Sequence, residues 1–476
     1  MSTVEPGYLR KLLPDEAPRE GEAWTDIQKD IEAKILPGIT HWQHPGFHAF
    51  FPCATSYPSI LGEMYSAALS GACFNWICSP AVTELETIVL DWLAKALGLP
   101  PCFLSTGPTN GGGVIQGSAS EAVLTAMVAA REKYLRETVP ATLVGDARDD
   151  AIALKRSRMV ALATTTTHSS TKKAAIILGL RFLTIPVPAS DNYALTAPVL
   201  SAALADCRAR GLEPFFLTAT LGTTDTCAVD DFAGITSALA SHISPNQSGE
   251  VWVHVDAAYA GAALVCPEIQ NSTRISLIQT FHSFNMNMHK WLLANFDASC
   301  LYVRNRAWFV QALSINQAVY TNAASAGGLV TDYREWQIPL GRRFRSLKIW
   351  FVLRSYGIAG LQEYIRRTIK LGEGFAASVR ERGDLFELVS GPSFALTVFR
   401  VVGSDEEERS ERTRRLYERV NASGKMWVTS TVLDGRFAIR LMTGVRTTGE
   451  VHVQRAVETL VREAEGVVNT SKEQRV

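Results

Sequence analysis

From about residue 56 to residue 346, short apolar runs alternate with amphipathic stretches. Several of the runs are continuous and rich in β-branched or aromatic residues, which is typical of parallel strands that are covered on both faces. The alternation therefore predicts a large α/β domain over residues 56–346 with a mostly parallel sheet. The candidate strands are 159–165 (MVALATT), 181–187 (RFLTIPV), 214–220 (PFFLTAT), 251–257 (VWVHVDA), 280–286 (TFHSFNM) and 299–305 (SCLYVRN).

The first 55 residues do not follow this pattern. They are interpreted as an N-terminal arm with one short helix over 24–36, which we expect to end before Pro37 and Gly38. An aromatic, proline-broken stretch follows over 41–58 and suits neither a helix nor a strand. That stretch fits a packing strap and the wall of a pocket equally well.

The C-terminal part of the chain changes character again. Residues 347–476 combine charged amphipathic helices with short strands at 393–401 and 435–443, which predicts a smaller α+β domain. The charges over 404–415 are of mixed sign and indicate a solvent-facing helix. A small, polar loop over 316–328 suits either a mobile lid or a surface connection.

The chain length and the net charge count against some functions but do not indicate a particular one. A chain of 476 residues suggests roughly three domains, or one large domain with appendages. Lys and Arg number 47 and so do Asp and Glu, so the formal net charge is zero. This balance gives no support to nucleic-acid binding, for which a basic excess is expected, and it permits self-association.

The cysteines and the hydrophobic pattern predict a cytosolic protein. None of the eight cysteines forms a CxxC pair, and no histidine cluster stands beside them at metal-ligand spacing, so we predict no metal site. The first 20 residues lack the apolar core of a signal peptide. No apolar run approaches the roughly 20 residues that span a bilayer, so no membrane association is predicted.

Four chemically suggestive side chains come just after predicted strands. They are His168, Thr224, Asp256 and Lys290. Ligands of open parallel sheets bind at the carboxyl ends of the strands, so four such positions together predict a site. Each residue taken alone has an ordinary explanation. Asp256 can cap the next helix, Lys290 can extend its amine to solvent, and His168 can be a core or surface histidine.

A glycine-rich stretch, 106–127 (TGPTNGGGVIQGSASEAVLTAM), precedes a predicted helix. Ser118 and Glu121 form a capping-box pattern, and glycines before a capped helix leave backbone N–H groups that can cradle a phosphate. The Walker and GxGxxG patterns are both absent, and the stretch alone also suits a generic loop-to-helix junction. Together with the strand-end residues it matches pyridoxal 5'-phosphate (PLP) chemistry, which needs a Schiff-base lysine, an acid beside the ring nitrogen and a phosphate cradle.

Longer motifs carry a resemblance over nearly the whole chain. The sequence resembles the group II PLP-dependent decarboxylases, and specifically the aromatic L-amino acid decarboxylases. The resemblance implies a fold type I (aspartate aminotransferase-like) large domain with a mostly parallel sheet, an N-terminal arm and a small α+β C-terminal domain. It also implies a homodimer with shared active sites. The matching words are 4–10 (VEPGYLR), 35–42 (ILPGITHW), 47–52 (FHAFFP), 79–86 (SPAVTELE), 111–122 (GGGVIQGSASEA), 254–261 (HVDAAYAG), 289–299 (HKWLLANFDAS) and 331–357 (TDYREWQIPLGRRFRSLKIWFVLRSYG).

The resemblance also implies roles for individual residues. Lys290 is similar to the lysine that binds PLP covalently, Asp256 to the partner of the ring nitrogen, and His168 to the histidine that stacks on the ring. Tyr320, the only tyrosine of the candidate lid, resembles the tyrosine that protonates Cα after carbon dioxide leaves, and it comes from the other subunit. The remaining cofactor-binding residues implied are Ser118, Ala119, Ser120, Thr224, Ala258, Asn287 and His289.

The substrate implied is an aromatic L-amino acid. The residues implied at its side chain are Trp42, Phe50, Phe51, Pro52, Ala72, Phe74 and Gly341, with Phe74 from the other subunit. In plant members glycine at the position of Gly341 goes with indole substrates and serine with phenolic ones. This favours tryptophan and hydroxytryptophans and leaves tyrosine, phenylalanine and dopa open.

Three other functions use the same scaffold. An aromatic acetaldehyde synthase couples decarboxylation to oxidative deamination, but there the lid tyrosine or the stacking histidine is replaced, whereas Tyr320 and His168 are both present here. A catalytically degenerate binding protein is expected to lack Lys290 or Asp256, and both are present. An aminotransferase is the weakest alternative. The sequence therefore predicts an aromatic-L-amino-acid decarboxylase, a carbon–carbon lyase.

Overall fold

The computed structural model describes residues 2–242, 249–315 and 330–473, with side chains up to residue 469. The chain divides into two compact units, one formed by Cys53–Arg367 and the other by Met1–Pro52 together with Thr368–Val476. Residues interpreted as a separate arm thus share a unit with the C-terminal region. Backbone pairing explains this, because the N–H of His48 donates to the carbonyl of Trp427 at 2.8 Å and the N–H of Met442 donates to the carbonyl of His48 at 3.0 Å.

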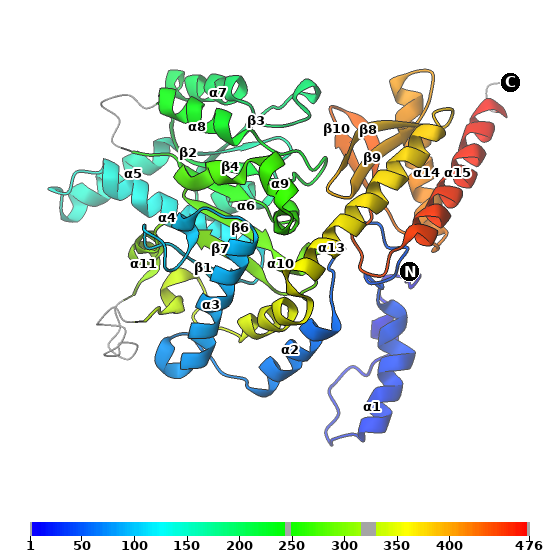
Figure 1. Ribbon diagram of the computed structural model, residues 1–476, viewed down its shortest axis with the longest axis horizontal. Helices are drawn as coiled ribbons and strands as arrows, with labels where there is room; N and C mark the ends of the chain where they lie inside the picture. Colours follow the sequence, from blue (N-terminus) through cyan, green and yellow to red (C-terminus); the bar gives the residue numbers. More distant parts are fainter. Residues whose placement is uncertain (1, 243–248, 316–329, 474–476) are drawn as a thin grey trace. The chain divides into compact units, whose positions relative to one another are not determined.

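A seven-stranded mixed sheet forms the centre of the Cys53–Arg367 unit (Figure 1). Its strand order is β1-β7-β6-β5-β4-β2-β3, in which only β7 runs antiparallel to its two neighbours. The strands are β1 (Gly112–Gln116), β2 (Met159–Thr164), β3 (Arg181–Ile185), β4 (Glu213–Thr220), β5 (Trp252–Asp256), β6 (Ser283–Asn287) and β7 (Ser299–Val303). Five of them, β1, β2, β5, β6 and β7, are buried along their whole length. Burial along the whole length of a strand is expected where helices cover both faces of the sheet.

The six predicted strands of this region are confirmed as β2 to β7. The structure adds β1, which lies inside the glycine-rich stretch that the sequence pattern left as a junction. Glycine is needed there for space rather than for flexibility. A Cβ at Gly113 would lie 2.8 Å from the ring of Tyr302 on the neighbouring strand, and one at Gly111 would lie 2.1 Å from the carbonyl oxygen of Cys102.

Helices cover both faces of this sheet (Figure 1). Helices α4, α6 and α11 pack side by side, whereas α7 packs against α8. Helix α13 is interrupted at Gly357, whose φ of 61° lies outside the helical region. The helices are α2 (Tyr57–Ala68), α3 (Pro80–Ala96), α4 (Ala119–Thr138), α5 (Gly145–Arg158), α6 (Ser170–Ile177), α7 (Ala197–Ala209), α8 (Phe232–His242), α9 (Pro267–Thr273), α10 (Met288–Trp291), α11 (Ala307–Leu313) and α13 (Arg345–Glu381). Short 3-10 helices lie at Trp76–Cys78, Pro101–Phe103, Ala189–Asp191, Ala260–Val265, Ile275–Thr280 and Tyr333–Trp336.

The second unit contains a four-stranded antiparallel sheet in the order β10-β11-β9-β8. The strands are β8 (Phe386–Ser393), β9 (Leu396–Val401), β10 (Thr429–Leu433) and β11 (Arg436–Met442), and the helices α14 (Glu406–Ala422) and α15 (Glu450–Glu473) pack against each other. The strands predicted over 393–401 and 435–443 correspond to β9 and β11. The charged run predicted as a helix lies in α14.

The N-terminal segment is helical for longer than the sequence predicts. After a 3-10 turn at Leu9–Lys11, α1 (Trp24–Asp30) continues into a π-helical turn (Ile31–Ile35) and a 3-10 turn (Leu36–Gly38). The prediction that the helix ends before Pro37 is wrong, because the helical segment continues to Gly38. Pro37 is tolerated because it stands in the first turn of the 3-10 segment, where its missing N–H is not needed. No helix in the described part of the chain is long and apolar enough to cross a membrane.

Candidate active site

Four neighbouring strands bring the four strand-end side chains to one edge of the sheet. β2, β4, β5 and β6 are parallel and adjacent in that order, so their carboxyl ends lie together. His168 and Thr224 follow β2 and β4, Asp256 is the last residue of β5, and Lys290 lies in the turn after β6. The arrangement predicted from the strand ends is therefore present.

The glycine-rich stretch reaches the same edge by way of β1. Gln116 at the end of β1 pairs with Ser299, which pairs in turn with Asn287 at the end of β6. Helix α4 begins at Ala119 directly after this strand. Ser118, Ala119 and Ser120 therefore lie at the edge that carries Lys290.

Asp256 is a buried carboxylate, with 4% of its surface exposed. Its Oδ1 accepts a hydrogen bond from the N–H of Ala258 at 3.0 Å, so part of the capping role expected of an ordinary aspartate is present. Within the described residues it forms no ion pair within 4.0 Å. A buried carboxylate without an ion-pair partner at this distance is costly, so Asp256 is suited to a cationic group supplied by a ligand.

The His168 ring has a defined tautomer. Its Nδ1 accepts from the N–H of Ser170 at 3.2 Å, which leaves the proton of the neutral ring on Nε2. Burial lowers the pKa of His168, and the positive charge of Lys290 lowers it further while the negative charge of Asp256 opposes the change. The three side chains are therefore close enough for their charges to interact, and His168 is neutral at neutral pH.

Lys290 is half-buried in the one-turn helix α10. The next residue, Trp291, is fully buried and stacks on Tyr259 with ring centroids 4.7 Å apart. The carbonyl of Lys290 accepts from the N–H of Ala54 at 3.0 Å. Packing and backbone pairing thus fix the backbone from which the lysine amine extends.

Asn287 and His289, which shortly precede Lys290, carry polar groups that suit a polar or charged ligand. His289 is buried, and its Nδ1 accepts from the N–H of Ala298 at 2.8 Å, which places the proton of the neutral ring on Nε2. Burial, followed by the charge of Lys290, lowers the pKa of His289 to about 3. Asn287 is buried as well, and its Oδ1 has no hydrogen-bond partner among the described residues. Such an atom is expected to gain a partner when a ligand binds.

The start of α4 is capped as predicted, with one difference. The N–H of Glu121 donates to Ser118 Oγ at 3.2 Å, but the carboxylate of Glu121 accepts from the N–H of Gly117 at 2.8 Å and not from that of Ser118. The first turn of any α-helix leaves its N–H groups without intrahelical partners. The N–H groups of Ala119 and Ser120 are therefore suited to bind an anion, helped by the helix dipole.

The loop that carries Thr224 is anchored by a residue that the sequence reasoning missed. Asp230 accepts hydrogen bonds from the N–H groups of Thr220 and Leu195, both at 2.7 Å. Its complete burial raises the pKa of Asp230 to about 7, while the two backbone hydrogen bonds oppose the rise. The only signal in the sequence is an aspartate shortly before a helix, which is too common to single out.

Three of the residues predicted at the substrate side chain are connected by the backbone of the Cys53–Arg367 unit. The N–H of Arg342 donates to the carbonyl of Ala72 at 2.8 Å, and the N–H of Arg334 donates to the carbonyl of Phe74 at 3.0 Å. Gly341 precedes Arg342 and is exposed. Backbone hydrogen bonds thus connect the segment of Ala72 and Phe74 to the segment from Arg334 to Arg342, which includes Gly341.

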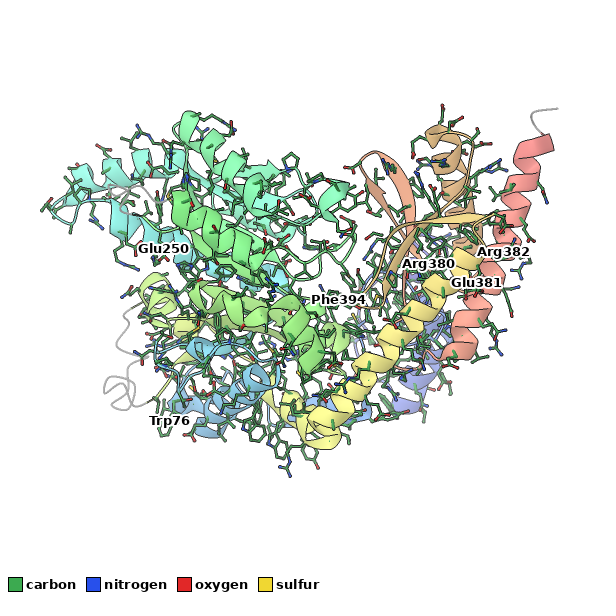
Figure 2. The ribbon with its side chains drawn as sticks, turned by 45° about the horizontal axis from the view of Figure 1, so that its top comes forward. Trp76, Glu250, Arg380, Glu381, Arg382 and Phe394 are labelled. Carbon is green, nitrogen blue, oxygen red and sulfur yellow. The ribbon has the colours of Figure 1, made fainter. Side chains whose placement is uncertain are left out.

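A buried ion pair secures this pairing. Arg342 donates to the carboxylate of Glu86, both side chains are almost fully buried, and the guanidinium lies over the ring of Tyr333 at 4.7 Å. Nearby, the N–H of Trp76 donates to Asp332 Oδ1 at 3.1 Å, and Figure 2 shows the Trp76 side chain. The sequence reasoning did not find this pair, because Glu86 and Arg342 are 256 residues apart.

The other four predicted substrate residues lie in the second unit. Trp42 stacks on Phe50 with ring centroids 5.5 Å apart, and the guanidinium of Arg440 lies 5.2 Å from the ring of Phe51. Pro52 is buried. The aromatic stretch over 41–58 therefore forms packed ring contacts. Tyr320 lies outside the described residues.

Comparison with known proteins identifies the family. The sequence pattern of the pyridoxal-dependent decarboxylase conserved domain matches residues 6–402. The chain belongs to the pyridoxal-dependent decarboxylases. It is a group II decarboxylase of fold type I and a carbon–carbon lyase, with PLP as its cofactor.

Relatives of this decarboxylase cover almost its whole length. It is 46% identical over 471 residues to phenylacetaldehyde synthase of Arabidopsis thaliana, covering 98% of this chain and 91% of that protein. It is 42% identical over 472 residues to the aromatic-L-amino-acid decarboxylase of Rattus norvegicus, covering 99% of this chain and 93% of that protein. The crystal structure of Oryza sativa TDC with PLP and tryptamine superimposes with a TM-score of 0.91 at 37% identity, covering 98% of this chain and 93% of that one.

The residues at the sheet edge fit the cofactor of a pyridoxal-dependent decarboxylase. Asp256 is a buried carboxylate with no ion pair among the described residues, which suits a partner of a protonated ring nitrogen. The N–H groups of Ala119 and Ser120 and the Nε2–H of His289 are donors suited to a phosphate. Lys290 supplies an amine beside them. No group of three or more His, Cys, Asp or Glu side chains that could hold a metal occurs among the described residues.

Proposed function

We propose that this enzyme decarboxylates aromatic L-amino acids to arylalkylamines, with tryptophan and hydroxytryptophans favoured and with tyrosine, phenylalanine and dopa as further substrates. The observation that carries the proposal is the convergence of Lys290, Asp256 and His168 at one sheet edge, with charges that interact. The rat relative is an aromatic-L-amino-acid decarboxylase, and the rice structure contains tryptamine, which is tryptophan without its carboxylate.

Bound PLP would supply an electron sink for the pair released when the Cα–carboxylate bond breaks. The Lys290 amine would hold the cofactor covalently and give way to the substrate amine. The Asp256 carboxylate would keep the ring nitrogen protonated, because an adjacent negative charge favours the protonated form. The buried surroundings would strip water from the substrate carboxylate and favour its departure as a neutral gas.

The other residues of the edge would position the cofactor. His168 would contact one face of the ring as a neutral imidazole, and Ala258 would contact the other face. A small side chain at position 258 leaves room for that contact. The phosphate would be bound by Ser118, Ala119, Ser120, Asn287 and His289, with Thr224 as a further contact. After carbon dioxide leaves, Tyr320 would protonate Cα.

The amino-acid side chain would be bound by aromatic and small residues. Trp42, Phe50, Phe51 and Pro52 come from the first 52 residues of the chain, and Ala72, Phe74 and Gly341 come from the paired segments secured by Glu86 and Arg342. Flat apolar rings suit an indole or a phenyl ring. Initial rates of carbon dioxide release from tryptophan, 5-hydroxytryptophan, tyrosine, phenylalanine and dopa test the proposal. Release from none of them, by enzyme with bound PLP, would refute it.

Gly341→Ser is expected to lower kcat/KM for tryptophan relative to tyrosine, by roughly tenfold in the ratio. A Cβ at Gly341 has no atom within 4 Å, so the serine fits without distorting the chain. Its hydroxyl offers a hydrogen bond to a phenol and removes space from an indole. Competition between the two amino acids in one assay measures the ratio, and Gly374→Ser is the matched control, because Gly374 is an exposed glycine of α13 whose Cβ would also have no atom within 4 Å. An unchanged ratio in Gly341→Ser would remove this residue from the substrate site.

A specific observation favours a second candidate activity. The Arabidopsis relative is a phenylacetaldehyde synthase. The two activities differ in what happens after carbon dioxide leaves: protonation of Cα gives the amine, whereas oxygen and water give the aldehyde, ammonia and hydrogen peroxide. Retention of Tyr320 and His168 supports the amine-forming reaction.

We also propose that the enzyme is a cytosolic homodimer. Helix α2 supports the dimer, because its buried face consists of Ser59, Gly62 and Ser66 while its large apolar side chains point outward. Tyr57 is 72% exposed and Met64 is 62% exposed. A helix that exposes its apolar face is typical of an interface with another chain.

Met64→Glu is expected to shift the enzyme from twice the chain mass of 52.0 kDa towards a single chain. The added charge opposes burial of the apolar face of α2 in an interface. Light scattering after size-exclusion chromatography measures the mass. Val144→Glu is the matched control, since Val144 is 76% exposed but isolated from this face, and it should stay dimeric. A wild-type mass of one chain would refute the dimer.

A further inference from the structure

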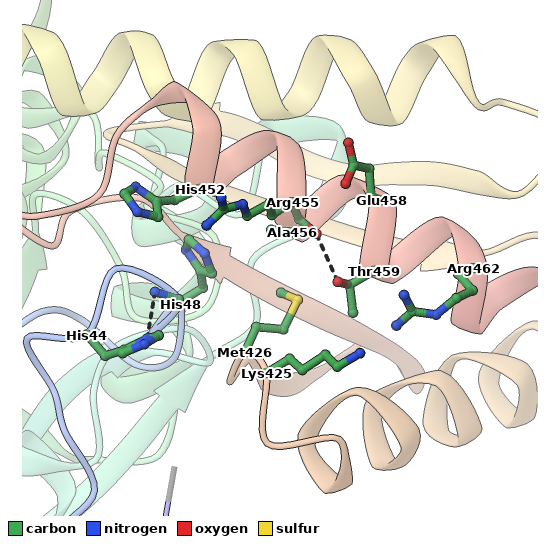
Figure 3. A pocket seen from close by; sticks show the side chains of 11 residues that line it. His44, His48, Lys425, Met426, His452, Arg455, Ala456, Glu458, Thr459 and Arg462 are labelled. Atoms are coloured by element: carbon green, nitrogen blue, oxygen red, sulfur yellow. Dashed lines mark hydrogen bonds between the residues drawn. The ribbon is translucent and has the colours of Figure 1, made fainter.

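A cavity of about 280 Å³ lies within the unit formed by Met1–Pro52 and Thr368–Val476. Its rim carries the exposed side chains of Lys425, Arg455 and Glu458, and its floor includes His48, which is only 1% exposed. Figure 3 shows these side chains around the cavity. None of the residues predicted to contact PLP belongs to this unit. The volume is near the lower end of the range for small-molecule sites.

The lining side chains come from three separate segments of the chain. His44 and His48 lie in the N-terminal segment, Lys425 lies in the connection between α14 and β10, and His452 and Arg455 lie on α15. These segments are fixed by backbone pairing, since the N–H of Trp427 donates to the carbonyl of Gly46 at 3.0 Å. The cavity is therefore surrounded by donors from several directions.

The histidines on the rim have defined donor atoms. His44 Nδ1 accepts from the N–H of Gly46 at 3.0 Å, and His452 Nδ1 accepts from the N–H of Gly449 at 3.0 Å. Each neutral ring therefore carries its proton on Nε2, which is a donor. Both rings thus act as hydrogen-bond donors whether or not they are charged.

The buried histidine on the floor is also orientated. His48 Nδ1 lies 2.9 Å from the carbonyl oxygen of Met442, which can only accept, so this nitrogen carries a proton. Its Nε2 has no partner among the described residues. Burial lowers the pKa of His48 to about 4, the Met442 hydrogen bond opposes this, and the charges of His452 and His44 lower it further. All three imidazoles line the cavity.

The fixed charges of the cavity are mainly positive. Lys425 and Arg455 form no ion pair within the described residues. Arg462 also lines the cavity, but it is paired with Glu463 at 3.1 Å. Glu458 is the one acidic side chain on the lining. A phosphate group suits such a lining, because it carries negative charge for the two unpaired cations and three strong acceptor oxygens for the cations and the two imidazole N–H donors.

We propose that this cavity binds the phosphate group of a small molecule, through Lys425, Arg455 and the Nε2–H groups of His44 and His452. The group is either free inorganic phosphate or a phosphomonoester. The site is additional to the cofactor site and goes beyond the proposed decarboxylation. It is independent of the substrate that the enzyme uses.

Calorimetric titration of the full-length, PLP-loaded enzyme with inorganic phosphate tests the proposal, with chloride at the same ionic strength as the blank. Saturable binding of one phosphate per chain is expected. The absorbance of bound PLP, recorded in parallel, should stay constant, which separates this site from the cofactor's phosphate cradle. A parallel titration with glycerol phosphate distinguishes the two sources of the group, and tighter binding of either one supports the site.

Arg455→Ala and Lys425→Ala should each weaken phosphate binding by roughly tenfold or more, because each removes a charged donor. Both side chains are exposed, so the variants should fold normally. Arg455→Lys should retain most of the affinity. Arg380→Ala is the matched control, an exposed arginine of α13 outside the cavity, seen in Figure 2. No saturable heat with either ligand, or equal affinity in Arg455→Ala and Arg380→Ala, would overturn the proposal.

Discussion

Asp256→Asn is expected to lower kcat for decarboxylation by about 10²- to 10³-fold, the loss typical of removing one preorganised electrostatic partner. Asparagine has nearly the same volume and keeps an oxygen that can accept from the N–H of Ala258, a hydrogen bond of 3.0 Å in the structure. The fold should therefore be unaffected. The negative charge that holds a proton on the cofactor's ring nitrogen is lost, and with it the electron sink. Steady-state kinetics with L-tryptophan measure the effect.

A second carboxylate of the site gives the control for Asp256. Asp225 is half-buried in the loop after β4, and its charge also acts on His168. Asp225→Asn removes one negative charge from the same region but not the group at the end of β5. We expect it to retain most of the activity. Equal losses in both variants would mean that Asp256 contributes only general negative potential, contrary to the assigned role.

Tyr320→Phe is expected to change the product as well as the rate. Without the hydroxyl, Cα has no positioned proton donor, and reaction with oxygen competes. The expected outcome is that amine formation becomes a minor path, while carbon dioxide release continues with aldehyde, ammonia and hydrogen peroxide as co-products. Chromatography of amine and aldehyde from one reaction, with a peroxide assay, gives the ratio.

Tyr417→Phe is the control for this variant. It removes a hydroxyl from α14, where the Tyr417 ring contacts the ring of Phe437 with centroids 6.1 Å apart. This variant should give only the amine. If Tyr320→Phe also gives amine at the wild-type rate, another group protonates Cα. The assignment of the proton donor would then be wrong.

Much of the fold could be predicted from the sequence, because buried parallel strands are continuous apolar runs. The parallel strands β2, β4 and β5 follow that rule, and the antiparallel strand β7 (SCLYV) is an apolar run as well. β1 does not, because its GGVIQ sequence also suits a loop, and only the folded chain shows that the ring of Tyr302 needs the space that Gly113 leaves. The backbone pairing of His48 with Trp427 and Met442 could not be predicted either. These residues are almost the whole chain apart, and no local sequence pattern indicates such a contact.

The site could be predicted only in part for a similar reason. Strand ends indicated Asp256 and Lys290, since carboxyl ends of parallel strands converge whatever the sequence between them. Ala258, Asn287 and His289 entered through the family resemblance, because an alanine, an asparagine and a buried histidine carry no pattern of their own. The supporting Asp230 and the buried Glu86 were missed. Their function depends on partners that only the folded chain brings near, such as the N–H of Leu195.

The central claim is that this chain is an amine-forming aromatic amino acid decarboxylase. Its most direct test is the stoichiometry of products from L-tryptophan and PLP-loaded enzyme in air-saturated buffer. We predict one tryptamine for each carbon dioxide, with neither hydrogen peroxide nor ammonia above the level of an enzyme-free control. Ammonia and hydrogen peroxide formed in equal amounts to carbon dioxide, with the aldehyde in place of tryptamine, would contradict the account.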